Sequence, residues 1–225
     1  MFGNLIPTLT IVKKQKQHLK HSRFSVAVLV LASVSSSHAA SILVSNFSFE
    51  NPGGGPLTYP QPTSWNSFGS SFTQISTEIG ITGATGSRHG GIDSAGETFF
   101  QDLGVSFLPS TVYTLTVAIV DYQNGNFAES SGLANFGLTD GGTLLGSTSA
   151  AGGANIFTDH TYSFTTGAVA PTGNVGILLS KTLTANGQRG LYDNIRLDAT
   201  AVPEPSSAAL LGGLGLLGLV GRRRR

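Results

Sequence analysis

The feature that most constrains the fold of this chain is a period-two pattern of apolar residues in short segments. In the segment 111–121, small or polar residues alternate with a series of larger apolar ones, Tyr113, Leu115, Val117 and Ile119. This period is that of a β-strand with one face packed on a core and the other less buried. No long helical period occurs between residues 40 and 200, so this part of the chain is predicted to be all-β.

Further segments of the same kind complete the predicted sheet structure. They are residues 42–50, 71–79, 98–103, 134–138, 157–165, 174–180 and 190–198. Sequences rich in glycine, asparagine and aspartate separate them, such as Asn124-Gly125-Asn126 and Asp140-Gly141-Gly142, and these residues favour turns. About eight short strands with turns of this type indicate a β-sandwich of the jelly-roll kind, in a single domain over residues 40–200.

The N-terminal residues 1–39 have the layout of a secretory signal peptide. Basic residues between Lys13 and Arg23 precede the apolar run 24–34, and the small residues around Ala39 follow. The run is too short to remain as a membrane anchor. We expect export by the Sec machinery and cleavage by signal peptidase after Ala39, with cleavage after Ala40 as the alternative.

The C-terminal residues 202–225 have three successive parts. The sequence Val202-Pro203-Glu204-Pro205 comes first, the uncharged apolar run 206–221 follows, and Arg222, Arg223, Arg224 and Arg225 end the chain. The two prolines favour an extended backbone. The apolar run is predicted to be a single transmembrane helix, slightly short for a bilayer, with the arginines on the cytoplasmic side. The alternative is a buried core helix that ends in solvated charges.

This tail resembles the bacterial PEP-CTERM sorting signal. The resemblance implies that an exosortase, a membrane-embedded cysteine transpeptidase, recognises the Pro-Glu-Pro sequence at residues 203–205. It also implies that the precursor stays in the inner membrane until this cleavage. The domain would then reach the cell surface or the extracellular matrix.

Charge and cysteine content limit the chemistry of the predicted domain. Residues 41–200 contain four basic residues against eleven acidic ones, which leaves a formal net charge of −7. This balance disfavours nucleic-acid binding, because phosphate contacts need a basic surface, and it suits divalent cations and neutral sugars. The chain has no cysteine, which excludes disulfides, thiol catalysis and cysteine–zinc sites.

The two ends of the domain carry a further resemblance. The segment 45–52 contains Asn46, Phe47 and Glu50, with Trp65 downstream, and the segment 191–197 reads Leu-Tyr-Asp-Asn-Ile-Arg-Leu. This combination resembles the galactose-binding-like jelly rolls, which include many carbohydrate-binding modules. The resemblance implies that the first and last strands lie close together and hold a structural calcium ion. The matching carboxylates are Glu50 and Asp193, and carbonyls and water would complete the calcium shell. The alternative is that both carboxylates make only turn and cap hydrogen bonds.

Aromatic and amide side chains near flexible loops are the candidates for sugar binding. Stacking on a ring face and a few hydrogen bonds are how neutral glycans are held. The candidates are Tyr59, Tyr122, Gln123, Asn124 and Asn126. Each of them is also explained as an ordinary turn residue. Trp65 is predicted to fill the sandwich core, with sugar stacking as the alternative.

The sequence offers little support for catalysis. The segment 88–93 places Arg88, His89 and Asp93 in one glycine-rich stretch, which we interpret as a loop too mobile for a preorganised site. His160 lies in an alternating segment and is predicted to sit on a sheet surface. Neither a Gly-x-Ser-x-Gly nor a His-Glu-x-x-His sequence occurs.

These observations predict an exported, non-catalytic domain that associates with extracellular polysaccharide. Two alternatives remain open. One is a structural matrix protein of biofilm or flocs without a defined ligand. The other is a calcium-dependent lyase, cyclase or glycosidase of the same fold, which would need a deep pocket with two acids of raised pKa.

Overall fold

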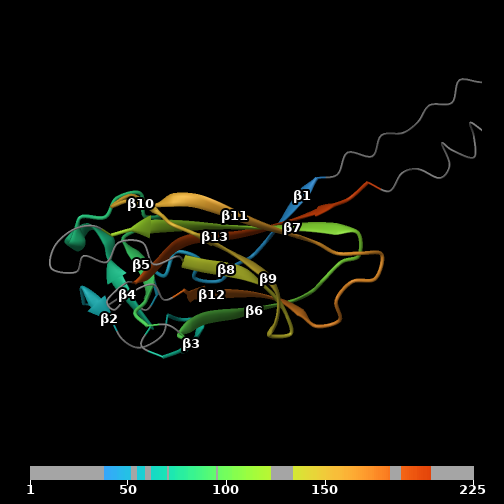
Figure 1. Cartoon of the computed structure of the whole chain (residues 1–225), viewed down its shortest axis with the longest axis horizontal. Coiled ribbons are helices and arrows are strands. Elements are labelled where there is room, and N and C mark those ends of the chain that lie inside the picture. The colour runs from blue at the N-terminus through green and yellow to red at the C-terminus, as the bar shows by residue number, and fades with distance from the viewer. Residues whose placement is uncertain are drawn as a thin grey trace, which may run out of the picture. The chain divides into compact units, whose positions relative to one another are not determined.

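The computed structural model describes residues 38–51, 55–58, 62–69, 71–94, 96–122, 134–182 and 189–203. They form two facing β-sheets, so the predicted all-β sandwich is confirmed (Figure 1). The helical structure of the described residues is one 3-10 turn, η1 (Ser76–Ile79). None of the helices in this part of the chain is long and apolar enough to cross a membrane. The predicted membrane segment 206–221, Arg222–Arg225 and residues 1–37 lie outside the described ranges.

The larger sheet, sheet A, has eight strands. They are β1 (Ala39–Ile42), β2 (Leu57–Thr58), β4 (Ser71–Ile75), β5 (Arg88–Ile92), β7 (Thr111–Asp121), β10 (Gly153–Ala154), β11 (Thr158–Thr165) and β13 (Gly190–Ala201). Their order is β10-β7-β13-β5-β4-β2, with β1 also beside β13 and β11 beside β7. The last strand of the chain therefore lies in the middle of this sheet.

The smaller sheet, sheet B, has five strands. They are β3 (Asn66–Phe68), β6 (Thr98–Ser106), β8 (Ala134–Asp140), β9 (Thr143–Ala150) and β12 (Asn174–Lys181), in the order β3-β6-β12-β8-β9. Their partners are antiparallel throughout. Antiparallel sheets of this kind can pack one face on a core and leave the other to solvent.

The main core lies between the two sheets and confirms the alternation seen in the sequence. The apolar face of β7 is fully buried, and β8 and β12 supply the facing layer from sheet B. The main members of this core are Tyr113, Leu115, Val117, Ile119, Phe136, Leu138, Ile177 and Leu179, each at most 1% exposed. A second cluster covers the outer face of sheet A around Phe72, Val120 and Leu191. Central strands of sheet A are thus buried on both faces.

The two ends of the domain meet at one end of the sandwich. Ala39 of β1 pairs with Thr200 of β13, and Ala201 pairs with Thr111 of β7. Figure 1 shows β1 and the end of β13 beside each other, with β4 and β5 toward the opposite end. We call these the exit end and the loop end of the sandwich. The closeness of the first and last strands is what the resemblance to the jelly rolls implied.

Two of the predicted strands are shorter than their sequence pattern indicated. The segment 42–50 leaves the sheet after Ile42 and forms a turn in which Asn46 and Phe49 have φ values of 49° and 57°. The Asn46 amide stabilises this turn, because its Nδ2 donates to the carbonyl of Thr63 at 2.9 Å and its Oδ1 accepts from the Asn51 amide at 3.0 Å. The segment 71–79 likewise divides into β4 and η1.

The interpretation of residues 88–93 as a mobile loop was wrong. Residues 88–92 form β5, which pairs with both β4 and β13. Its glycines allow large rings to pack against the backbone, because a Cβ on Gly90 would come within 2.8 Å of the Phe49 ring and a Cβ on Gly91 would fall inside the Phe72 ring. Glycine here marks close packing and not mobility. Strand β9 was also not predicted, since its residues are mostly serine, threonine and glycine.

We predict that Gly91→Ala destabilises the domain by about 1–3 kcal/mol, because the buried Phe72 ring has no free space into which to move. Gly55→Ala is the matched control, since nothing lies within 4 Å of a Cβ at that position. Urea unfolding of both variants measures the difference. Equal stabilities of the two would contradict the packing argument.

Candidate functional site

The structure brings the two predicted calcium ligands to the same short segment, residues 85–88. The Glu50 carboxylate accepts the backbone amides of Ser87 and Arg88 at 2.8 and 2.7 Å, and the Ser87 hydroxyl at 2.8 Å. The Asp193 carboxylate accepts the Thr85 amide at 2.5 Å. Glu50 also raises the pKa of Asp193 through its charge, so the two carboxylates are close enough to interact. We call them the carboxylate pair.

A β-bulge in β13 positions Asp193. The register of β13 against β7 shifts between Asp193 and Arg196, and Asn194 has a φ of 46°. In a regular strand, residues three positions apart point to opposite faces of the sheet. The bulge changes this, so that Tyr192 and Ile195 both reach the main core. Asp193 itself is fully buried.

Burial is the main cause of an unusual pKa at Asp193. Burial and, to a smaller extent, the Glu50 charge raise the pKa of this carboxyl to about 7, against the lowering effect of hydrogen bonds from the Thr85 and Asn194 amides. A buried carboxyl of this kind is partly protonated near neutral pH when no cation is present. A divalent cation would reverse this preference by favouring the ionised form.

The carboxylate pair has room for some, but not all, of a calcium shell. Two carboxylates offer about eight acceptor positions, and the donors from Thr85, Ser87, Arg88 and Asn194 use part of them. Calcium takes six to eight oxygens, so carbonyls or water would have to supply the rest. Among the described residues there is no group of three or more His, Cys, Asp or Glu side chains suited to a metal. A calcium ion at the carboxylate pair therefore stays a prediction.

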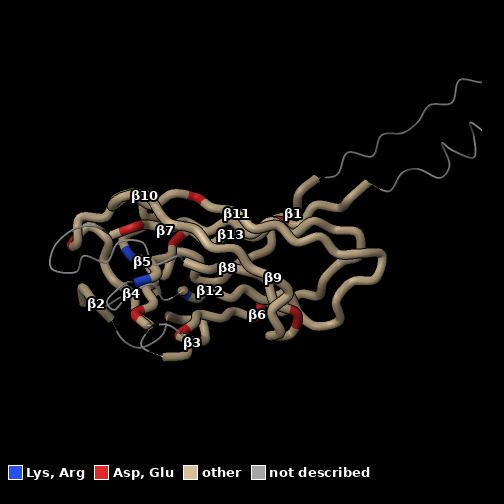
Figure 2. Tube along the Cα trace, in the orientation of Figure 1, with Lys and Arg blue, Asp and Glu red and all other residues tan. Residues whose placement is uncertain are grey.

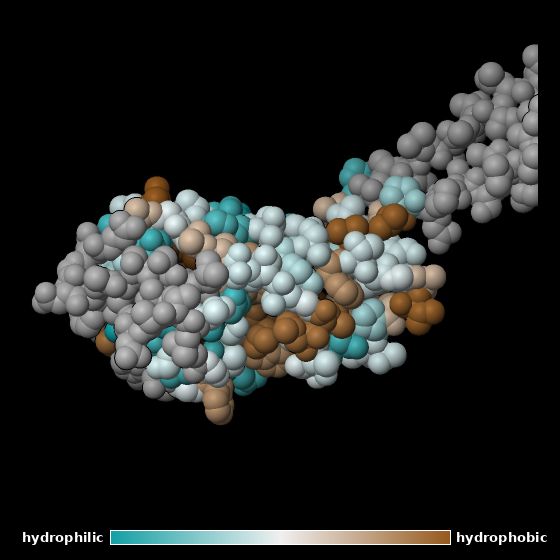
Figure 3. All heavy atoms as spheres, viewed as in Figure 1, coloured by the Kyte–Doolittle hydropathy of each residue, from teal (hydrophilic) through white to brown (hydrophobic). Residues whose placement is uncertain are grey.

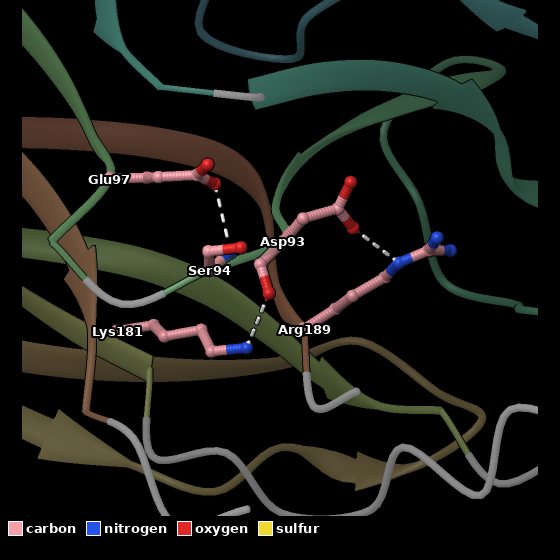
Figure 4. Close-up of polar contacts among 5 residues, drawn as sticks. All are labelled: Asp93, Ser94, Glu97, Lys181 and Arg189. Carbon is pink, nitrogen blue, oxygen red and sulfur yellow. Dashed lines mark hydrogen bonds and ion pairs between the residues drawn. The ribbon is translucent and has the colours of Figure 1, made fainter. Parts of the chain in front are cut away.

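A charged cluster occupies the loop end, where Figure 2 shows blue segments near β4, β5 and β12. Asp93 is its centre (Figure 4): its carboxylate pairs with Arg189 Nε at 2.6 Å and its carbonyl accepts Lys181 Nζ at 2.8 Å. Glu97 accepts the Ser94 amide at 2.8 Å, and Arg189 also lies over the Phe72 ring at 4.9 Å. The two acidic and two basic side chains balance in charge. We interpret the cluster as a structural one that holds the ends of neighbouring strands together.

Arg88 and His89, which precede Asp93 in the sequence, are buried in β5, and their side chains contact other residues of the domain. Arg88 donates to Gly55, Thr58 and Thr73, and His89 Nδ1 lies 2.9 Å from the Ser76 hydroxyl. Burial, together with the charges of Arg189 and Arg88, lowers the pKa of His89 to about 3. His89 is therefore neutral at any physiological pH.

Two shallow depressions flank the exposed side chain of Leu43. One, of roughly 390 Å³, we call the Phe47 groove; it is lined by Ser41, Ile42, Leu43, Val44, Phe47, Asn194, Ile195 and Arg196. Within it, Phe47 is 39% exposed, and the Arg196 guanidinium pairs with Asp159. The other, of roughly 330 Å³, includes Gln101 and Asp102. Their volumes lie at the lower end of the range for ligand sites.

Sequence reasoning did not single out the Phe47 groove. Its signal was present in the chain, because the break in alternation after Ile42 left Leu43 and Phe47 outside the core. The resemblance motifs at residues 45–52 and 191–197 contain half of the residues that form it. From the sequence, those motifs predict only the jelly-roll fold and a calcium site.

The other predicted site residues fall in different places. Trp65 is 1% exposed and stacks on Phe49 at 5.3 Å, so the core interpretation is confirmed. Tyr122 is half-buried against the second apolar cluster. His160 is half-buried on β11, with Nε2 at 3.0 Å from the Thr158 hydroxyl. Four sugar-binding candidates lie outside the described residues, namely Tyr59, Gln123, Asn124 and Asn126.

The processing points lie at the exit end. Ala39 and Ala40 form the first half of β1. Val202 and Pro203 follow β13 directly, and the Val202 amide donates to the Ser110 carbonyl at 2.7 Å. Glu204 and Pro205 lie outside the described residues.

The fold and its C-terminal motif define an exported β-sandwich protein that carries an exosortase-recognised tail. The PEP-CTERM protein-sorting motif matches residues 201–225, so the predicted sorting motif is confirmed, and with it processing at the membrane. Residues 40–198 match the family described as HpiC1-like, HpiC1 cyclase. The chain belongs to this HpiC1 cyclase-like family. The expectation of a non-catalytic domain is therefore not confirmed.

Solved structures agree on the fold. The FisC cyclase from Fischerella sp. TAU, in complex with (3Z)-3-(1-methyl-2-pyrrolidinylidene)-3H-indole, aligns with a TM-score of 0.64 and 21% identity, covering 73% of this chain and 100% of that one. A second cyclase structure from the same source has a TM-score of 0.63 and 20% identity, over 74% and 100% of the two chains. A xylan-binding domain from Paenibacillus barcinonensis has a TM-score of 0.45 and 12% identity, over 75% and 100%, which is too distant to carry an argument. No curated protein matches the sequence.

We predict that the metal-free domain loses stability as pH rises. The pKa of Asp193 is about 7 in the folded state against 3.8 as a reference, so between these values the folded state binds more protons. The free energy of unfolding should fall in this window by up to about 1.4 kcal/mol per pH unit and level off above it. Urea unfolding in chelator measures the slope.

Asp193→Asn should remove this pH dependence, because the amide does not titrate. Asp102→Asn, on exposed surface of sheet B, is the control and should keep it. An unchanged slope in the Asp193→Asn variant would assign the effect to other groups.

Proposed function

We propose that this exported protein is a binding domain that associates with extracellular polysaccharide without catalysing a reaction. The observation that carries the proposal is the Phe47 groove, which is shallow and combines an exposed aromatic ring with polar side chains. Neutral glycans are held by such stacking and by a small number of hydrogen bonds. The formal charge of −7 on residues 41–200 also favours neutral over anionic sugars.

The position of the groove supports an extended ligand. It continues past Leu43 to the second depression, where Ser45, Ser64 and Asp102 supply hydroxyl and carboxylate groups. An oligosaccharide could therefore contact both sides of Leu43. A chain of several sugar units is the ligand class that best fits two shallow depressions in a row.

We further propose that the carboxylate pair holds a calcium ion with a structural role. The support is electrostatic: Asp193 is fully buried, lies near a second carboxylate, and has its pKa raised to about 7. A divalent cation would relieve both the burial cost and the repulsion. It would join the turn after β1, segment 85–88 and β13, and of these the turn and β13 line the groove.

We predict that Phe47→Ala weakens binding to a polysaccharide fragment about tenfold, the effect of losing about 1.4 kcal/mol of stacking. Phe68→Ala is the matched control, since Phe68 is 73% exposed on β3 and lies outside the groove. A glycan array of the exported domain, with calcium and with chelator, identifies the fragment, and titration calorimetry gives the affinities.

The outcomes of this experiment separate the candidate functions. Equal loss in both Phe variants would contradict the groove as the site. A folded domain that binds no glycan in either condition would overturn the proposal in favour of a structural matrix role.

We predict that calcium raises the unfolding free energy of the domain, by about 2.7 kcal/mol at a hundredfold excess over the dissociation constant. The reason is that the ion binds a carboxylate pair assembled only in the folded state. Thermal unfolding with calcium and with chelator measures the effect. Asp193→Asn should abolish it and Asp102→Asn should not, and an equal melting temperature of the wild type in both conditions would refute a calcium site.

Membership of the HpiC1 cyclase-like family favours acid-catalysed cyclisation as a second candidate function. Burial raises the pKa of Asp193 to about 7, which suits a general acid at neutral pH. Catalysis by Asp193 and calcium binding by Asp193 exclude each other, because calcium would keep the carboxylate ionised. Incubation with indole compounds, followed by chromatography for products of unchanged mass, tests this candidate. Conversion that is lost in Asp193→Asn would favour it.

A further inference from the structure

Two loops at the exit end expose apolar side chains and carry no charge. The first, residues 107–110, presents Leu108 at 59% exposure, and the second, residues 166–173, presents Val169 at 86%. Figure 2 shows the loops at this end without charged segments, and Figure 3 shows hydrophobic side chains there. Exposed apolar side chains that gather in one patch mark a surface that contacts a membrane or another protein.

Both loops are held rigidly and side by side. The Ser110 amide donates to the Gly167 carbonyl at 2.8 Å, and the Thr166 hydroxyl donates to the Leu108 carbonyl at 2.7 Å. Directly beside the exposed Leu108, the buried Phe107 packs edge-on against Tyr113 at 5.0 Å. The Leu108 amide donates to the Tyr113 hydroxyl at 2.7 Å. The exposure of Leu108 is therefore a fixed feature of the fold and not a result of a loose loop.

The chain leaves the sandwich next to these loops. The Val202 amide donates to the Ser110 carbonyl at 2.7 Å, and Val202 is itself 40% exposed. The PEP-CTERM motif begins at residue 201, so no spacer separates the last strand from the sorting tail. The uncharged run 206–221 starts only a few residues further on.

We propose that the exit end of the sandwich rests on the lipid bilayer before exosortase processing, with Leu108 and Val169 inserted at the membrane interface. This inference requires the apolar run 206–221 to cross the bilayer. A tail of that kind, attached without a spacer, brings both loops to the membrane surface. Paired backbone groups in the loops lower the cost of entering the interface, since Ser110 and Thr166 already satisfy several of them. The exit end thus has a lipid surface as its partner.

Single-cysteine labelling tests the proposal on the full chain, which has no cysteine of its own. Val169→Cys and Leu108→Cys, each carrying an environment-sensitive fluorophore, are reconstituted in phosphatidylethanolamine–phosphatidylglycerol vesicles. Phe68→Cys is the matched control, because Phe68 is an equally exposed apolar residue whose partner, Thr98, begins β6 at the loop end. Iodide in the water and brominated lipid in the bilayer serve as the two quenchers.

The expected result is quenching of the labels at 108 and 169 by brominated lipid, with loss of their quenching by iodide. The label at 68 should respond to iodide alone. Iodide quenching of all three labels would overturn the proposal, and so would a chain that does not float with the vesicles. The result is independent of glycan binding, because neither labelled loop contributes to the Phe47 groove.

Discussion

The pairing of β13 with β7, β5 and β1 is the interaction on which the rest of the structure depends. This last strand supplies Tyr192 and Leu197 to the main core and Leu191 to the second cluster. Its partner strands come from regions far apart in the sequence, so most of sheet A cannot form before β13 is present. Sheet A is therefore incomplete until residue 201 has been exported, which is also where the sorting motif begins.

The acidic and basic groups of the domain have two different environments. At the loop end, Asp93, Lys181 and Arg189 satisfy one another in a compact group of opposite charges. Around the bulge in β13, by contrast, Glu50 and Asp193 are two like charges held together by backbone amides. The first arrangement is complete in itself, and the second is where we propose a calcium ion.

The sequence was sufficient for the parts of the fold that follow a local pattern. The alternation in β7, the burial of Trp65 and the sorting motif could all be predicted, because each depends on neighbouring residues. Strand β5 could not be predicted in this way. Its glycines are needed because the rings of Phe49 and Phe72, which come from other segments of the chain, pack directly against its backbone. The two carboxylates were predicted from the resemblance to the jelly rolls, whereas their hydrogen bonds and burial follow only from the structure. The Phe47 groove was missed because it forms only where β1 meets the bulge of β13.

The pairing of Ala39 with Thr200 has a consequence for how this domain can be used as a building block. Neighbouring antiparallel strands lie only about 5 Å apart, so a connector of a few residues could join the two ends of the sandwich. The chain could then be reopened at the Gly141-Gly142 turn between β8 and β9, giving a circular permutant with the same contacts. For the same reason the domain could be inserted into a surface loop of another protein, because its two attachment points would occupy the space of a single hairpin.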